Sequence, residues 1–150
     1  SYADALNKNY DEGPPKDWEL QFVSSYASSH PWEDWAETWA HYLHMHDTLD
    51  TALSFGLGAE DVEIDFEPFL KDVLWQPDLD GAAEFLDFIN AWAELTGVLN
   101  EMSRSMGVHD FYPFVLNRAV VAKLHFIHCV VRGAHVERVP EPPQEVDQPE

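Results

Sequence analysis

The stretch from Pro31 to Phe55 constrains the fold more than any other part of this sequence. It begins with proline, and no further proline or glycine follows until Gly56. Proline is well tolerated in the first turn of an α-helix, where its missing N–H would have no partner, and glycine commonly ends a helix. The pattern therefore predicts one long helix from Pro31 to about Phe55.

Helical spacing of apolar residues recurs along the rest of the chain and predicts an all-α protein with about six helices. The expected helices are residues 2 to 10, Trp18 to about Ala27, Pro31 to about Phe55, Phe66 to Trp75, about Gly81 to Ser105, and Pro113 to Gly133. Residues 59 to 65 form an expected acidic loop with room for one short strand. No Asn-Gly turn and no repeated run of alternating apolar residues occurs, which argues against a sheet-based fold.

The domain organisation follows from length and composition. A chain of 150 residues that is 45% hydrophobic can bury the core of a single domain. Residues 137 to 150 contain four of the ten prolines and five carboxylates, with little to bury. We therefore expect one helical domain over residues 1 to 136 and a disordered, acidic, proline-rich tail over residues 137 to 150.

The charge of the chain excludes several classes of partner. Eight Lys and Arg stand against 28 Asp and Glu, which gives a net charge of −20. Such a chain is not expected to bind nucleic acid or anionic membrane surfaces. The single Cys129 excludes an intrachain disulfide and a four-cysteine zinc ribbon. With no signal peptide at its start and no apolar run of about 20 residues, the chain is expected to be cytoplasmic.

Four potential metal ligands share one side of the predicted helix, within a stripe about 80° wide at about 100° per residue. These residues are Glu33, Glu37, His41 and His44. The opposite side carries Trp32, Trp35, Trp39 and Tyr42. In the simplest interpretation, the tryptophan side packs in the core and the Glu/His side is solvated. However, no Lys or Arg occurs from Pro31 to Phe55, so a metal ion could supply the missing positive charge.

The sequence contains no complete metal motif of two common kinds. A ferritin-like di-iron bundle needs Glu-x-x-His on two helices, and none of the eight histidines has a glutamate three residues before it. The metalloprotease motif His-Glu-x-x-His is absent, because no histidine is followed by glutamate. The stripe therefore looks like one wall of a metal site.

A second group of potential ligands lies in the predicted last helix. His125, His128 and Cys129 are spaced so that they share a helix face, but their neighbours Phe126 and Ile127 are apolar. The favoured interpretation is that the histidines pack in the core or lie at the surface, and an incidental metal site is the alternative. Cys129 is expected to be an inert buried thiol.

A long motif identifies a related family. Residues 30 to 44 read His-Pro-Trp-Glu-Asp-Trp-Ala-Glu-Thr-Trp-Ala-His-Tyr-Leu-His, and Asp-Thr-Leu follows at 47 to 49. This motif, with the segments from Tyr2 to Trp18 and from Phe22 to Ala27, resembles the bacterial zinc-binding metallopeptidase family over about residues 2 to 57. Members of that family carry a zinc ribbon and a zincin helix with His-Glu-x-Gly-His. Because both are missing here, the resemblance implies the C-terminal helical part of a longer peptidase.

The resemblance also implies roles for the stripe. In a gluzincin-like site, two histidines of an upstream helix and one glutamate of a later helix bind zinc. In the related pattern Glu-x-x-Ala-Glu the first glutamate is the ligand, and Glu33 occupies that position. Glu37 would then hold a ligand histidine in its tautomer, and His41 and His44 would lie around the site as supporting residues.

The implied substrate is a peptide or protein, and the implied cofactor is zinc. Without the upstream histidines and the general-base glutamate, this chain alone is expected to be inactive and to bind zinc weakly. Two other functions stay open on the sequence. One is a non-catalytic helical interaction module, and the other is a binding protein that holds a metal with the Glu33/Glu37/His41/His44 stripe.

Overall fold

The computed structural model describes residues 1–58 and 64–133, and these residues form four α-helices, three short 3-10 helices and no strand. The α-helices are α1 (Tyr2–Glu12), α2 (Pro31–Ser54), α3 (Ala82–Ser105) and α4 (Arg118–Val131). The 3-10 helices are η1 (Trp18–Leu20), η2 (Ala27–Ser29) and η4 (Lys71–Val73). The all-α prediction is confirmed, although the described residues contain four α-helices where about six helices were expected.

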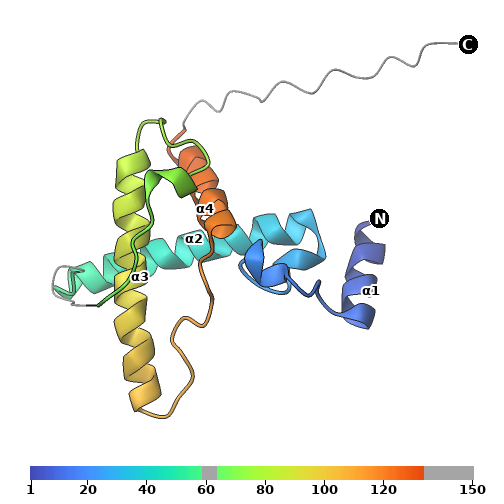
Figure 1. Ribbon diagram of the computed structural model, residues 1–150, viewed down its shortest axis with the longest axis horizontal. Coiled ribbons are helices and arrows are strands. Elements are labelled where there is room, and N and C mark those ends of the chain that lie inside the picture. Colours follow the sequence, from blue (N-terminus) through green and yellow to red (C-terminus); the bar gives the residue numbers. More distant parts are fainter. Residues whose placement is uncertain (59–63, 134–150) are drawn as a thin grey trace, which may run out of the picture.

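Helix α2 runs through the middle of the molecule, and α3 and α4 cross it at steep angles (Figure 1). Helix α4 packs against both α2 and α3, whereas α1 lies at the edge and contacts η2. His30 starts α2, because its ring Nδ1 accepts a hydrogen bond from the backbone N–H of Trp32 at 3.1 Å. Gly56 follows the end of α2 with a φ of 75°, a left-handed conformation that glycine adopts readily.

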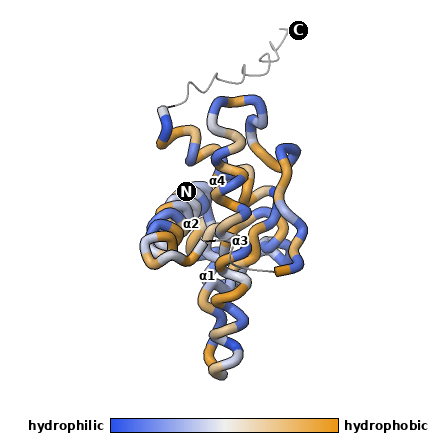
Figure 2. Tube along the Cα trace, turned by 90° about the vertical axis from the view of Figure 1, so that its left-hand side faces the viewer, coloured by the Kyte–Doolittle hydropathy of each residue, from blue (hydrophilic) through white to orange (hydrophobic). Residues whose placement is uncertain are grey.

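The core lies where α2, α3 and α4 meet. Met45 of α2, Phe85 and Ile89 of α3 and Leu124 of α4 are fully buried there. Hydrophobic and hydrophilic residues alternate in bands along these helices, as expected for helices that each bury one face (Figure 2).

The buried face of α2 lies between the two stripes that the sequence distinguishes. Thr38 and Met45 are buried, because α3 and α4 meet α2 over this intermediate face. Trp32 and Trp35 are 67% and 46% exposed, so the expectation that the whole tryptophan side packs in the core was wrong. On the other side, Glu33 and Glu37 are half-buried and His41 is buried, so the expectation of a solvated Glu/His side fails for these three residues.

The predicted helix from Trp18 to about Ala27 is wrong beyond its first turn. Only η1 is helical there, and η2 starts at Ala27 itself. The physical reason is Ser24, whose hydroxyl accepts a hydrogen bond from the backbone N–H of Ala27 at 3.0 Å. Serine side chains that bond to nearby backbone in this way give the chain an alternative to the helix.

Two further helices were predicted too long. Of the expected helix from Phe66 to Trp75, only η4 forms, because Pro68 lacks an N–H and the backbone of Phe69 pairs with the side chain of Asn90 instead. The last helix begins at Arg118 rather than Pro113. Asn117 caps it, since its side chain accepts a hydrogen bond from the N–H of Val120 at 2.9 Å.

Some predictions fall on residues that the structure does not describe. The expected tail at 137 to 150 lies wholly outside the described residues, and the expected acidic loop at 59 to 65 lies mostly outside them. Of that loop, only Ile64 and Asp65 are described, and neither is in a helix or strand. Within residues 1–58 and 64–133, no helix combines the length and the apolar character that crossing a membrane requires.

The histidines of α4 lie in the core. His125 is fully buried, and His128 is 5% exposed with its Nδ1 at 3.0 Å from the hydroxyl of Tyr42. Cys129 is also buried, with its sulfur 3.5 Å from Nε2 of His125. Burial lowers the pKa of His128 to about 4, because the protonated ring would lose its hydration.

The free energy of unfolding should therefore fall as the pH drops from about 6.5 to about 4. A histidine of the unfolded chain takes up a proton near pH 6.5, whereas His128 in the folded chain does so only at about 4. Between these values protons bind preferentially to the unfolded state. Urea unfolding of the 150-residue chain over this pH range measures the effect.

The variant His128→Asn is the control, because it keeps a short polar group near Tyr42 but has no titrating ring. Its unfolding free energy should depend less steeply on pH than that of the unmodified chain. The same steepness in both proteins would show that His128 does not carry the effect.

Candidate functional site

Glu33 lies in the first turn of α2 and is held by a residue from the start of the chain. The hydroxyl of Tyr2, on α1, donates a hydrogen bond to Oε1 of Glu33. The ring of Tyr2 packs against His30 and Trp32, with ring centres 4.9 and 5.2 Å apart. The hydrogen bond to this carboxylate raises the pKa of Tyr2 to about 12. Tyr2 therefore stays protonated near neutral pH and orients one oxygen of Glu33.

Glu37 lies one turn further along α2 and is held by the loop that precedes the helix. The hydroxyl of Ser24 donates a hydrogen bond to Oε2 of Glu37 at 2.8 Å. Tyr26 belongs to the same loop. Its pKa is raised, first by burial and then by the negative charge of Glu33.

The two glutamates are half-buried, and no basic residue among residues 1–58 and 64–133 forms an ion pair with either of them. The adjacent Asp34 differs, since its Oδ2 lies 2.7 Å from Nζ of Lys123. Two carboxylates one turn apart repel each other, and their side-chain hydrogen bonds to described residues come from the neutral hydroxyl groups of Tyr2 and Ser24.

His41 lies two turns beyond Glu33 and is covered by residues that follow α3. It is 8% exposed, and its Nδ1 is 2.6 Å from the hydroxyl of Tyr112. The ring of Phe114 packs edge-on against it at 4.5 Å. Burial lowers the pKa of His41, although the charge of Glu37 opposes this effect. His41 is therefore a neutral imidazole at neutral pH.

His44 is exposed, so the four residues of the stripe do not share one environment. Glu33 and Glu37 are held by hydroxyl groups, His41 is covered by aromatic rings, and His44 faces solvent.

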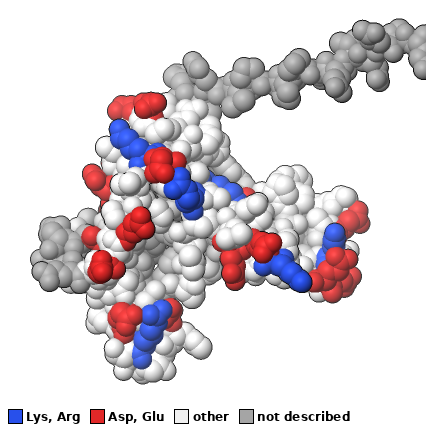
Figure 3. Space-filling model, viewed as in Figure 1, with Lys and Arg blue, Asp and Glu red and all other residues white. Residues whose placement is uncertain are grey.

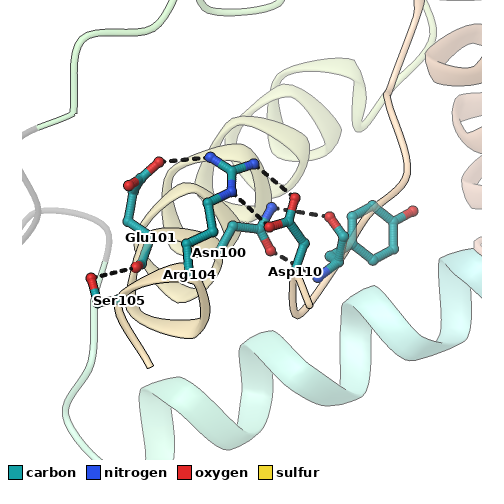
Figure 4. Close-up of polar contacts among 6 residues, drawn as sticks. Asn100, Glu101, Arg104, Ser105 and Asp110 are labelled. Atoms are coloured by element: carbon teal, nitrogen blue, oxygen red, sulfur yellow. Dashed lines mark hydrogen bonds and ion pairs between the residues drawn. The ribbon is translucent and has the colours of Figure 1, made fainter. Parts of the chain in front are cut away.

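The segment that carries Tyr112 is tied to the end of α3 by side chains (Figure 4). The amide of Asn100 accepts a hydrogen bond from the N–H of Tyr112 at 2.8 Å and donates one to its carbonyl oxygen at 3.0 Å. Arg104 binds both carboxylate oxygens of Asp110 at 2.7 Å and also reaches Glu101 at 2.8 Å. These contacts fix the loop that places the Tyr112 hydroxyl on His41.

The sequence analysis did not assign a role to Tyr2, Ser24 or Tyr112. Tyr2 and Ser24 belong to segments that carried the family resemblance, but their spacing from Glu33 gave no sign of contact. Tyr112 lies 71 residues from His41 along the chain, so only the fold shows that they meet.

The described residues alone do not form a zinc site. No group of three His, Cys, Asp or Glu residues within residues 1–58 and 64–133 is placed to hold a metal ion. Zinc in proteins usually has at least three protein ligands. This part of the chain offers the carboxylate of Glu33, whose Oε2 accepts no hydrogen bond from any described residue. Most of the face drawn in Figure 3 is uncharged, and its acidic side chains lie in scattered groups, several of which adjoin the basic ones.

Comparison with known proteins identifies related sequences. A family model described as "Putative zinc-binding metallo-peptidase" matches residues 1–130. Uncharacterized proteins of Mycobacterium bovis and Mycobacterium tuberculosis are 47% identical to the chain over 130 residues. The match covers 87% of this chain and 35% of each relative, so the chain spans about a third of the length of these relatives. No solved structure matches the chain.

Replacing Asn100 with alanine should loosen Tyr112. Both backbone hydrogen bonds would be lost, and the free energy of unfolding should fall by about 1 to 3 kcal/mol, as for other part-buried polar groups that lose a partner. Urea unfolding measures this change, and the nuclear magnetic resonance (NMR) signals of the His41 ring should move in the same variant. The exposed Asn7→Ala should change stability by less than about 0.5 kcal/mol. A stable Asn100→Ala protein with an unchanged His41 signal would contradict the positioning role.

Proposed function

Because this chain belongs to the zinc-binding metallopeptidase family, we propose that it supplies the glutamate ligand of the zinc ion in a longer peptidase. Glu33 is that ligand. The two histidine ligands and the general base come from a part of the longer protein that precedes this chain, and the substrate is a peptide or protein.

The observation that carries this proposal is the unpaired charge of Glu33 and Glu37. Two half-buried carboxylates one turn apart are unfavourable without a cation, and no described basic residue pairs with them. A divalent metal ion placed against Glu33 would remove this repulsion. The start of α2 adds a smaller favourable term for a negative charge in its first turn.

The surrounding hydroxyl groups suit a single metal–oxygen contact. Tyr2 holds Oε1 of Glu33 and leaves Oε2 without a partner among the described residues, so that Oε2 can bind the metal. Ser24 holds Oε2 of Glu37, which leaves its Oε1 to accept the ring N–H of an incoming ligand histidine. A zinc ion held by Glu33 would supply a Lewis acid for polarising a scissile carbonyl and activating water.

The chain alone is inactive in this proposal, since one carboxylate does not make a zinc site. A second candidate function, protein–protein interaction, is favoured by the exposure of Trp32 and Trp35. In the proposed peptidase, the same exposed rings belong to the surface that the rest of the longer chain covers.

The isolated 150-residue chain should bind zinc with a dissociation constant weaker than about 1 micromolar, equivalent to roughly −8 kcal/mol. The longer protein should hold one zinc ion tightly. In the longer protein, Glu33→Gln should abolish stoichiometric zinc and peptidase activity, whereas Glu37→Gln should lower zinc affinity by about 10-fold to 100-fold. Calorimetry and metal analysis measure these changes.

Glu94→Gln, on a different helix from Glu33 and Glu37, is the matched control and should keep both zinc and activity. Tight zinc binding by the isolated chain that Glu33→Ala abolishes would show that this chain has further ligands. Full activity of Glu33→Gln would move the ligand role to another residue.

A further inference from the structure

One side of α2 is uncharged and largely exposed over about three turns of the helix. At about 100° per residue, six side chains share an arc of about 140° beside Glu33. These residues, called here the uncharged face of α2, are Trp32, Trp35, Ala36, Trp39, Ala40 and Leu43. Trp32, Trp35 and Leu43 are 67%, 46% and 49% exposed, and Ala36 is exposed as well. A contiguous apolar surface on a chain with a net charge of −20 marks a place where another polypeptide packs.

The uncharged face continues into a hollow on the side of Trp35. The hollow has a volume of about 370 Å³, lies between α2 and α4, and has mainly apolar walls. The ring of Phe126 is central to it, with the ring centres of Trp35 and Trp75 at 5.9 and 4.8 Å. The two charged residues that line it, Asp34 and Lys123, pair with each other at 2.7 Å, so the hollow carries no net charge. Such a hollow suits a large apolar side chain that anchors an interface.

On its other edge, the uncharged face borders Glu33 and Glu37. Ala36 and Ala40 lie between the glutamates and the tryptophans, about 60° and 20° from Glu33 around the helix axis. Because alanine is small, a segment that packs over these two residues comes close to the backbone of α2. Side chains at the edge of such a segment lie beside Glu33, whose Oε2 has no partner among the described residues.

The size of the uncharged face indicates an occupant larger than one side chain. From Trp32 to Leu43 the face extends about 16 Å along the helix, at 1.5 Å per residue. The match to the mycobacterial relatives covers 35% of each of them, so about two-thirds of their length lies outside it. The longer protein therefore has enough additional chain to cover the whole face.

We propose that the part of the longer protein that carries the zinc-binding histidines packs on the uncharged face of α2, with an apolar side chain anchored in the hollow beside Trp35. This inference rests on the proposed function, because the position of Glu33 decides which part of the longer protein comes near. The surface that the occupant presents to α2 is apolar, since the face offers no charge to pair with. Burial of apolar surface holds this contact together, and the histidines approach Glu33 from the side of the two alanines.

Hydroxyl-radical footprinting with mass spectrometry compares the zinc-loaded longer protein with the 150-residue chain. Radicals oxidise side chains that are in contact with water. Oxidation of Trp32, Trp35 and Leu43 should be at least about tenfold slower in the longer protein, because the centre of an interface excludes water. Met106, which follows α3 and is 79% exposed, is the internal control and should be oxidised at the same rate in both proteins.

Two exposed leucines provide matched variants. Leu43 belongs to the uncharged face, and Leu20, which is 68% exposed, belongs to η1. Neither Leu43→Glu nor Leu20→Glu should change the urea midpoint of the isolated chain, because both positions are exposed there. In the longer protein, Leu43→Glu should restore oxidation of Trp32 and Trp35, since an unpaired carboxylate is costly to bury. Leu20→Glu should leave both tryptophans protected.

The proposal is overturned if the three face residues are oxidised equally fast in both proteins, or if the two glutamate variants behave alike. It is also overturned if protection appears only at concentrations at which the longer protein dimerises, because a second copy would then be the occupant. Zinc analysis of the same samples separates this proposal from the assignment of Glu33. Zinc bound through Glu33 beside an oxidised face would contradict the docking alone, and a protected face in a protein without zinc would contradict the assignment of Glu33 alone.

Discussion

The hydrogen bonds that Glu33 and Glu37 accept connect the segments before α2 to the first turns of this helix. The two carboxylates lie one turn apart on α2, half-buried and without a basic partner among the described residues. Tyr2 of α1 and Ser24 of the preceding loop each donate a hydroxyl hydrogen bond to one of them. These contacts attach α1 and the loop to the start of α2 through neutral donors, which leaves the negative charge available for a cation from outside the described residues.

Asparagine side chains hold irregular segments next to α3 and α4 in the same way, by hydrogen bonds. Asn90 pairs with the backbone of Phe69, Asn100 with the backbone of Tyr112, and Asn117 with the first turn of α4. Each fixes an irregular segment beside a helix. Because the segment of Tyr112 covers His41, the surroundings of that histidine depend on the hydrogen bonds of Asn100 as well as on helix packing.

The sequence predicts the long helices well because their limits are local. Pro31 begins α2, Gly56 follows its end, and glycine likewise follows α3. The sequence-based prediction fails where a side chain takes backbone hydrogen bonds that a helix would use. Asn90, which is distant in the chain, does so at Phe69. Ser24 does so within its own segment, despite the apolar pattern there. The same limit applies to the site. Helical spacing places Glu33 beside Glu37, but the contacts with Tyr2 and Tyr112 join segments far apart in the chain.

The central claim is that Glu33 is a zinc ligand whose partners lie in another part of a longer peptidase. A crystal structure of that longer protein with zinc, phased on the anomalous signal of the metal, tests it most directly. The account predicts an oxygen of Glu33 within about 2.0 to 2.2 Å of the zinc ion, with two histidines from outside this chain completing the protein ligands. A zinc ion bound without Glu33, or bound through Glu37 in its place, would contradict the account.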